Sequence, residues 1–198
     1  PGTGKSEFAK FLAWRMGRRI VHRRGSDLLG MYVGQTEHNI AEAFRAAEED
    51  DALLVFDEVD TFLRDRRQAQ HQWEVSQVNE FLQQLEGFRG VLVCTTNLRD
   101  GLDEASLRRF AFKVEFGFLK PEQSMRLFVE ALPGPMGADE EQLVARELER
   151  MTMLAPGDFA AVARRAAALR LVMTPASLLE ALRRECEVKR VGGRRVGF

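Results

Sequence analysis

The chain opens on Pro1-Gly2-Thr3-Gly4-Lys5-Ser6, and a helical pattern from Ser6 to Met16 follows at once. This stretch matches the second half of the phosphate-binding pattern GxxxxGK[ST]. Glycines let backbone N–H groups turn toward phosphate oxygens, and the positive end of the following helix favours the same anion. Lys5 is expected to reach the β- and γ-phosphates of a nucleotide, and the Ser6 hydroxyl is expected to hold Mg²⁺. The predicted phosphate-binding residues are therefore Gly2, Thr3, Gly4, Lys5 and Ser6.

On its own, this half-pattern is equally typical of a glycine-rich turn before a helix. A phosphate loop of this kind follows a strand that is central to its sheet, and the chain begins after the place of that strand. We therefore expect the chain to be truncated at the phosphate loop and the isolated fragment to bind nucleotide poorly.

A second signal follows an apolar run. Leu53 to Phe56 are four apolar residues that lead directly into Asp57 and Glu58. The spacing places both carboxylates at the carboxyl end of a buried strand, where open α/β sheets bind ligands. Asp57 is predicted to bind Mg²⁺, directly or through water, and Glu58 to act as the base that orients the attacking water. Two solvated acids in a turn are the alternative, and the phosphate loop upstream favours the functional interpretation.

Around these motifs, strand and helix patterns alternate through the first two thirds of the chain. The apolar runs predict strands at 20–22, 52–56, 91–94 and 112–116, and the helical patterns lie at 6–16, 37–49 and 73–85. Alternation of this kind predicts a doubly wound α/β fold with a mostly parallel sheet.

After Phe118 the patterns are helical only, at 122–132, 139–151, 158–171 and 175–187. We expect an α/β domain at 1–118, a small all-helical domain at 119–188, and a tail at 189–198. The glycine- and arginine-rich stretch from Val188 is expected to fray.

Composition narrows the class of protein. The 198 residues carry a net charge of −1 and are 45% hydrophobic, which is typical of a soluble globular protein. The charge balance argues against a permanent electrostatic grip on nucleic acid or membrane. Cys94 and Cys186 lack metal-ligand or CxxC spacing, so they are predicted to be buried free thiols in a reducing, cytoplasmic setting.

With both motifs in place, the chain resembles the AAA family of ATPases. The stretch from Thr95 to Phe110, TTNLRDGLDEASLRRF, is similar to the family's second region of homology. The resemblance implies that Asn97 senses the γ-phosphate and the attacking water. It also implies that Arg108 and Arg109 are arginine fingers that reach the nucleotide of the next subunit. The working unit implied by the family is a homo-oligomer, a hexameric ring.

The stretch GMYVGQTE, from Gly30 to Glu37, resembles the family's first pore loop. The resemblance implies that Tyr32 and Val33 face a central channel and grip an extended polypeptide. A tyrosine suits this task because it offers a large apolar area with little rotamer entropy to lose. The alternative is that Tyr32 fills the core beneath a helix start, with Thr36 as the N-cap.

Other features are expected to be structural. Gly157-Asp158-Phe159 falls where many relatives place a helix start beside the adenine, but Asp158 is equally suited to a helix N-terminus. The helical spacing of Trp73, Phe81 and Leu85 predicts core positions, and Trp14 is expected to be buried too. The basic run at 64–67 is expected to be a solvated loop.

The sequence thus predicts an ATP- and Mg²⁺-dependent AAA motor that remodels, unfolds or threads protein substrates through a ring. The alternatives are a DNA-directed ATPase of the same superfamily, such as a loader or branch-migration motor, and a nucleotide-gated scaffold. The balanced charge and the pore-loop triplet argue against the first alternative. The intact set of motif residues argues against the second.

Overall fold

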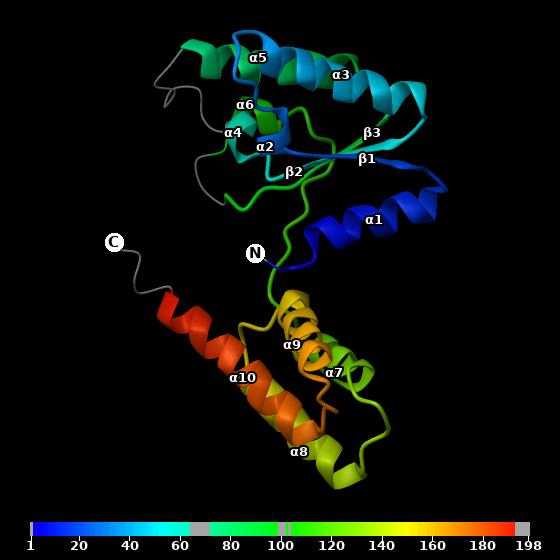
Figure 1. Ribbon diagram of the computed structural model, residues 1–198, viewed down its shortest axis with the longest axis vertical. Coiled ribbons are helices and arrows are strands. Elements are labelled where there is room, and N and C mark those ends of the chain that lie inside the picture. The colour runs from blue at the N-terminus through cyan, green and yellow to red at the C-terminus, as the bar shows by residue number, and fades with distance from the viewer. Residues whose placement is uncertain (1, 64–71, 99–101, 103, 193–198) are drawn as a thin grey trace. The chain divides into compact units, whose positions relative to one another are not determined.

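The structure is a computed structural model that describes residues 2–63, 72–98, 102 and 104–192. Its contacts divide the chain into two compact units. One is an α/β unit of residues 5–114, and the other is a helical unit of residues 115–198 together with residues 1–4. Figure 1 shows the elements of both units.

The α/β unit is built on a three-stranded parallel sheet in the order β1-β2-β3. The strands are β1 (Ile20–Arg24), β2 (Leu53–Asp57) and β3 (Val91–Cys94). Leu53 to Phe56 of the central strand are completely buried, as expected for a strand covered on both faces. The predicted doubly wound α/β fold with a parallel sheet is confirmed.

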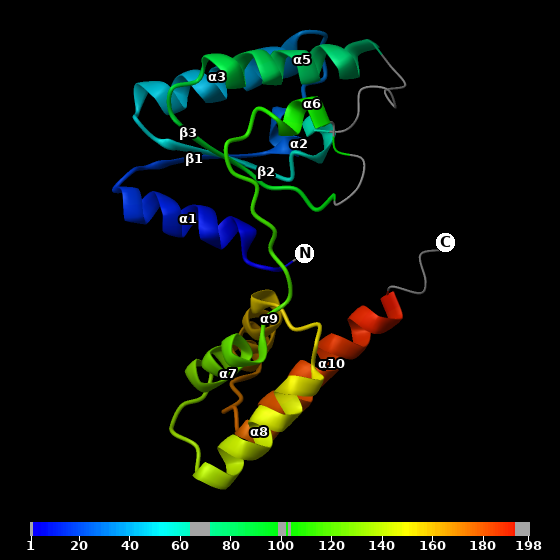
Figure 2. The ribbon, with the colours of Figure 1, turned by 180° about the vertical axis from the view of Figure 1, so that it is seen from behind.

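Helices cover both faces of this sheet (Figures 1 and 2). Helix α1 (Lys5–Met16) lies on one face, and α3 (Gln35–Glu49) and α5 (Gln72–Gly87) lie on the other. Side chains alternate along β2, so that Leu54 and Phe56 belong to the core under α3 and α5, while Leu53 and Val55 belong to the core under α1. Three short helices stand at the ends of strands and loops: α2 (Gly25–Leu28), α4 (Asp60–Leu63) and α6 (Glu104–Leu107).

The larger core is aromatic. The rings of Phe44 and Phe56 meet edge-on with their centroids 5.5 Å apart. The centroid of the Phe81 ring lies 5.8 Å from that of Phe56 and 6.0 Å from that of Phe62. Packing of this kind orders the end of β2 and the segment that follows it, because Phe62 lies only a few residues beyond Asp57. The core therefore supports the positions at which the acidic residues were predicted to act.

The helical unit contains α7 (Pro121–Glu130), α8 (Ala138–Arg150), α9 (Pro156–Leu169) and α10 (Pro175–Gly192). Three of the four helices begin with proline, whose fixed φ suits the first helical turn. The unit has an apolar core of its own, which includes Phe128, Leu148, Leu154 and Leu182.

One strand prediction was wrong. The stretch 112–116 is not assigned as a strand of the described sheet, and Phe112 and Val114 are exposed. Helix α10 extends past Val188 to Gly192. The basic loop at 64–67 lies outside the described residues.

The aromatic predictions had mixed outcomes. Phe81 is fully buried, as expected, but Trp73 is 52% exposed and Trp14 is 72% exposed. Helix α1 meets the sheet through the small residues Ala9 and Ala13, which turns Trp14 away from that contact. Within the described part of the chain, no helix is both long enough and apolar enough to span a membrane.

Candidate nucleotide site

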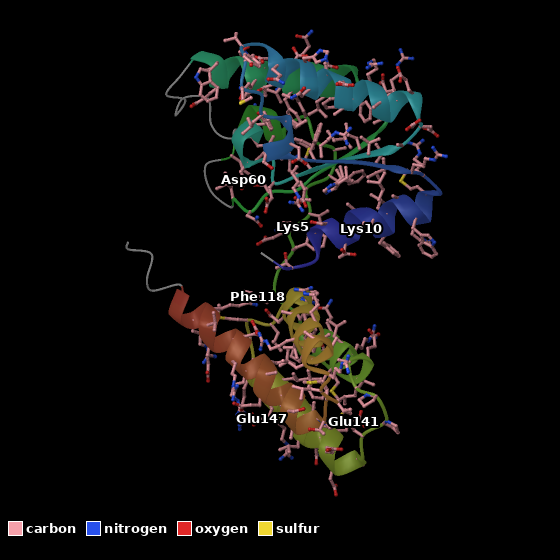
Figure 3. The ribbon with its side chains drawn as sticks, viewed as in Figure 1. Lys5, Lys10, Asp60, Phe118, Glu141 and Glu147 are labelled. Carbon is pink, nitrogen blue, oxygen red and sulfur yellow. The ribbon has the colours of Figure 1, made fainter. Side chains whose placement is uncertain are left out.

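Four of the predicted site residues converge within the α/β unit. The Lys5 ammonium donates a hydrogen bond to Asn97 Oδ1 at 2.7 Å, although the two residues are 92 positions apart. The Ser6 hydroxyl donates to Asp57 Oδ2 at 2.9 Å. Lys5 and Ser6 begin α1, Asp57 ends β2, and Asn97 follows β3, so the contacts form at the carboxyl ends of two neighbouring parallel strands. Figure 3 labels Lys5 in this region together with Asp60.

Asp57 is held as a carboxylate. Burial by itself raises the pKa of the Asp57 carboxyl. Hydrogen bonds from Thr95 and Ser6, and then the nearby His22 ring, outweigh burial and keep that pKa below its ordinary value of 3.8. His22 Nε2 lies 3.7 Å from Asp57 Oδ2. Asp57 is therefore ionised at neutral pH, as a magnesium ligand must be.

Glu58 has a different environment from its neighbour. Its side chain is exposed, and its backbone lies in the left-handed region with φ of 58°. The Glu58 N–H donates to Thr95 Oγ1 at 3.2 Å, and the same Thr95 hydroxyl donates to Asp57 Oδ1. One threonine side chain thus connects both predicted acidic residues to the end of β3.

Asp60 holds the loop that carries Asn97, a role that the sequence analysis missed. Its Oδ1 accepts the Thr96 hydroxyl and also the backbone N–H of Asn97, the latter at 3.2 Å. His22 and Thr95 were also missed. The sequence did show two threonines, Thr95 and Thr96, directly before Asn97, and a third acidic residue, Asp60, shortly after Asp57. Neither pattern shows which hydroxyl pairs with which acid.

The predicted phosphate-loop residues before Lys5 belong to the helical unit by their contacts. Gly2 and Gly4 have φ values of 78° and 97°, which glycine adopts without strain. The Gly2 carbonyl accepts the N–H of Gly157, at the start of α9, at 2.8 Å. The Thr3 hydroxyl oxygen is buried without a hydrogen-bond partner, which is a costly state for a polar atom unless a ligand satisfies it.

The Ser6 and Asp57 side chains fit Mg²⁺. Adjacent ligands of an octahedral Mg²⁺ with bonds of 2.0–2.1 Å lie about 3 Å apart, and Ser6 Oγ and Asp57 Oδ2 are separated by 2.9 Å. Among the described residues no group of three or more His, Cys, Asp or Glu side chains could hold a metal ion. Two protein oxygens completed by phosphates and water are the arrangement that Mg²⁺ commonly takes.

Arg108 and Arg109 follow α6 and are exposed. The Arg109 Nε donates to Glu86 Oε1, at the end of α5, at 2.6 Å. Arg109 therefore has an ion-pair partner within its own α/β unit, on the surface where both side chains keep contact with solvent.

Tyr32 and Val33 protrude from the segment before α3. Tyr32 is 74% exposed and Val33 is fully exposed, so Tyr32 does not fill the core. Gly34 is the N-cap residue of α3, and the Thr36 hydroxyl instead accepts the Gly30 N–H at 2.9 Å. The Gln35 side-chain oxygen accepts two further N–H groups of the loop, from Met31 and Tyr32. The loop is thus folded back on α3 while its apolar tip faces outward.

Asp158 has structural partners. It is 6% exposed, accepts the Ala155 N–H at 2.7 Å as a helix cap, and forms an ion pair with Lys189 of α10 at 2.6 Å. Lys189 also donates to the Met153 carbonyl and lies over the ring of Phe118. The helix-terminus interpretation of Asp158 therefore has direct support. Both cysteines are free, with Cys186 buried and Cys94 half-buried.

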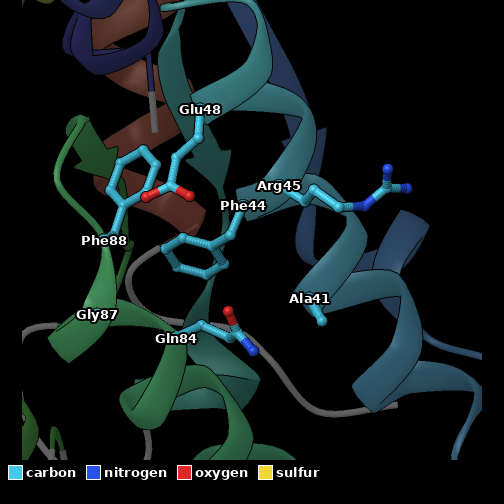
Figure 4. A pocket seen from close by; sticks show the side chains of 7 residues that line it. All are labelled: Ala41, Phe44, Arg45, Glu48, Gln84, Gly87 and Phe88. Carbon is cyan, nitrogen blue, oxygen red and sulfur yellow. The ribbon is translucent and has the colours of Figure 1, made fainter.

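A small pocket of about 170 Å³ lies between α3 and α5, away from these residues (Figure 4). Its lining includes the rings of Phe44 and Phe88 and the side chains of Arg45 and Glu48. None of the predicted site residues lines it, and it is smaller than the 300–1,000 Å³ typical of ligand sites.

Comparison with known proteins shows which family the sequence matches. The family model described as "ATPase family associated with various cellular activities (AAA)" matches residues 1–118. Spastin of Sus scrofa is 32% identical over 159 residues, which cover 77% of this chain and 26% of that protein. Spastin of Drosophila erecta is 30% identical over 160 residues, with 77% and 21% covered. The chain spans about a quarter or less of the length of these relatives.

A parallel sheet with lysine, serine, carboxylate and amide groups meeting at the carboxyl ends of its strands defines the class of P-loop nucleotide-binding proteins. Since the family model covers more than half of the chain, the chain belongs to the AAA family of ATPases.

Proposed function

We propose that this chain is the ATP-binding and ATP-hydrolysing core of an oligomeric motor that remodels, unfolds or threads protein substrates. The observation that carries the proposal is the meeting of Lys5 with Asn97 and of Ser6 with Asp57. In the proposal, residues 1–118 form the ATPase domain, residues 119–188 form its lid and residues 189–198 a tail. The free cysteines support a cytoplasmic location.

Each residue has a role that follows from its chemistry. Lys5 contacts the terminal phosphates, and Asn97 contacts the γ-phosphate and the attacking water, because an amide both donates and accepts. Ser6 and Asp57 would hold Mg²⁺, which supplies positive charge next to the phosphate oxygens. Gly2, Thr3 and Gly4 provide the loop around the phosphates.

Glu58 orients the attacking water and accepts its proton. As the water oxygen bonds to the terminal phosphorus, the bond from that phosphorus to the ADP oxygen breaks. The exposed Glu58 side chain is available for this task, while Asp57 is occupied with Ser6 and Thr95.

Arg108 and Arg109 act on the nucleotide of a neighbouring subunit in a hexameric ring. Fingers of this kind contribute about 10³–10⁵ in rate. Because Arg109 pairs with Glu86 in its own unit, the proposal requires that this exposed pair opens or that Arg108 makes the contact across the interface. Exposed ion pairs contribute only about 0.2–1 kcal/mol, so opening the pair is a small cost.

The proposed substrate is an extended polypeptide, gripped by Tyr32 and Val33. Their exposure, on a loop fastened to α3 by Thr36 and Gln35, supports this role. Two adjacent exposed apolar residues on one loop would give such a grip apolar contact area.

The test measures ATP binding and steady-state turnover of the full-length protein against protein concentration. Glu58→Gln should keep ATP affinity and abolish turnover, and the wild-type rate per subunit should rise steeply with concentration. A flat, low rate equal to that of Glu58→Gln would favour a nucleotide-gated scaffold. Stimulation by DNA instead of unfolded protein, unaffected by Tyr32→Ala, would favour a DNA-directed ATPase.

A further inference from the structure

The backbone of Glu58 has a conformation that needs outside support. Its φ of 58° lies in the left-handed region, which residues with a side chain occupy rarely. Such a conformation persists where the surrounding structure holds it, and it often marks a functional position. The neighbours of the Glu58 backbone should therefore determine where its carboxylate points.

Thr95 holds one side of this backbone. The Thr95 N–H donates to the Phe56 carbonyl at 2.9 Å, and the Thr95 carbonyl accepts the Val59 N–H at 3.0 Å. Between these two bonds, the Thr95 hydroxyl accepts the Glu58 N–H at 3.2 Å. The Thr95 hydroxyl thus accepts the Glu58 N–H in the way that a backbone carbonyl would accept it in a strand.

Gly25 lies close to the carbonyl group of Glu58. The register of β1 and β2 pairs Arg24 with Asp57, so Gly25 comes next to Glu58. A Cβ atom on Gly25 would lie 2.5 Å from the Glu58 carbonyl oxygen and 3.8 Å from that of Asp57. Gly25 itself has no positive φ, so its backbone is one that alanine adopts. Glycine is needed here for the close approach of Glu58 and not for its own conformation.

Within the described part of the chain, nothing supports the Glu58 carboxylate directly. No described residue forms a hydrogen bond or an ion pair with it, in contrast to Asp57, which is bound on both oxygens. Its direction therefore depends on the backbone from which it projects. That backbone is confined between Gly25 and Thr95.

We propose that Gly25 and Thr95 are positioning residues that set the direction of the Glu58 carboxylate, Gly25 by leaving room for the Glu58 carbonyl and Thr95 by fastening its N–H. This inference rests on the proposed role of Glu58 in orienting the attacking water. A base that is displaced by a fraction of an ångström to an ångström loses much of its effect, because proton transfer requires hydrogen-bond distance.

Gly25→Ala is the main test, with Gly137→Ala as the matched control. Gly137 precedes α8 with φ of −72°, and a Cβ there would meet no atom within 4 Å. In the full-length protein, Gly25→Ala should lower ATP turnover at least about tenfold while the Kd for ATP stays within about twofold. Gly137→Ala should change neither quantity. Turnover of Gly25→Ala within about twofold of wild type would overturn the proposal.

Loss of ATP binding in Gly25→Ala would also overturn it, because the glycine would then be needed for the fold of the site and not for the direction of one side chain. A second pair of variants approaches Glu58 from the opposite side. Thr95→Ser keeps the hydroxyl and should keep turnover, whereas Thr95→Val has the same shape without the acceptor and should lose it. Equal turnover in the serine and valine variants would contradict the role of Thr95.

Glu58→Gln separates this inference from the proposed function. If Glu58→Gln keeps full turnover, the proposed function of Glu58 is wrong and the inference fails with it. If Glu58→Gln abolishes turnover and Gly25→Ala does not lower it, only the positioning role is wrong. In the Glu58→Gln background, adding Gly25→Ala should leave the residual rate and the Kd for ATP unchanged, because residues that act as a unit are not additive.

Discussion

Asp60→Ala should impair turnover by releasing the loop that carries Asn97. Asp60 Oδ1 accepts the Thr96 hydroxyl and the Asn97 N–H. A hydrogen bond to a charged group contributes about 1.5–3 kcal/mol. Because this site is partly exposed, the lower value applies, and the two bonds together contribute about 3 kcal/mol. If half of that sum is lost from the transition state, turnover falls about tenfold, and if all of it is lost, about a hundredfold or slightly more.

Asp60→Asn is the informative companion variant. An asparagine side chain keeps an oxygen at the same position that accepts both hydrogen bonds. We expect its turnover to stay within about threefold of wild type, and Asp139→Ala, at the exposed start of α8, serves as a control for loss of a carboxylate. The assay is steady-state ATPase activity with the Kd for ATP measured in parallel. Unchanged turnover in Asp60→Ala would refute the reasoning, and equal losses in Asp60→Ala and Asp60→Asn would show that charge matters and acceptor geometry does not.

Three further predictions concern the pKa of a carboxylate, the core and the subunit contact. Thr95→Val removes a hydrogen bond that lowers the pKa of Asp57 while burial, which raises it, remains, so that pKa should rise. The lowered pKa of Asp57 stabilises the folded state above pH 3.8, the ordinary value, and this contribution is lost as the pH falls through the pKa of folded Asp57. Because that pKa is higher in the variant, the variant should lose this stability at a higher pH than wild type does. A carboxyl NMR titration measures the shift, and no shift would contradict the assignment. Phe81→Ala removes a fully buried ring and should lower the free energy of unfolding by about 3–5 kcal/mol in urea titrations, whereas a loss under about 1 kcal/mol would not fit this core. Arg109→Ala should lower turnover about 10³-fold if Arg109 acts as a finger, and mixing with Glu58→Gln subunits should restore part of it; unchanged turnover in Arg109→Ala alone would contradict that role.

Much of the fold follows from periodicity in the sequence. The apolar run before Asp57 and the helical patterns on both sides of it predicted a parallel sheet with helices on both faces, which the structure has. Patterns of this kind succeed because burial of one helix face or of a whole strand constrains many residues at once. The stretch 112–116 shows the limit of the same reasoning. An apolar alternation indicates that a segment suits a strand, but a strand also requires ladder hydrogen bonds with a neighbour, and 112–116 is not part of the described sheet.

The two exposed tryptophans make the same point for helices. Helical spacing predicted that Trp14 would be buried, yet α1 packs on the sheet through alanines. Which stripe of a helix faces the core depends on the surface it meets, and that surface is built from distant parts of the chain.

For the candidate site, the sequence by itself determined which residues have the chemistry. Lys5, Ser6, Asp57 and Glu58 were predicted from their types and from their places after glycines or at a strand end, and Asn97 from the resemblance to the AAA family. The tertiary structure decided which atoms meet: Lys5 with Asn97, Ser6 with Asp57, and Thr95 with both acids. It also decided that Gly25 lies against Glu58. The physical reason is that hydrogen bonds and close approaches depend on tenths of an ångström between segments far apart in the chain, whereas residue patterns report only which face or strand end a side chain occupies.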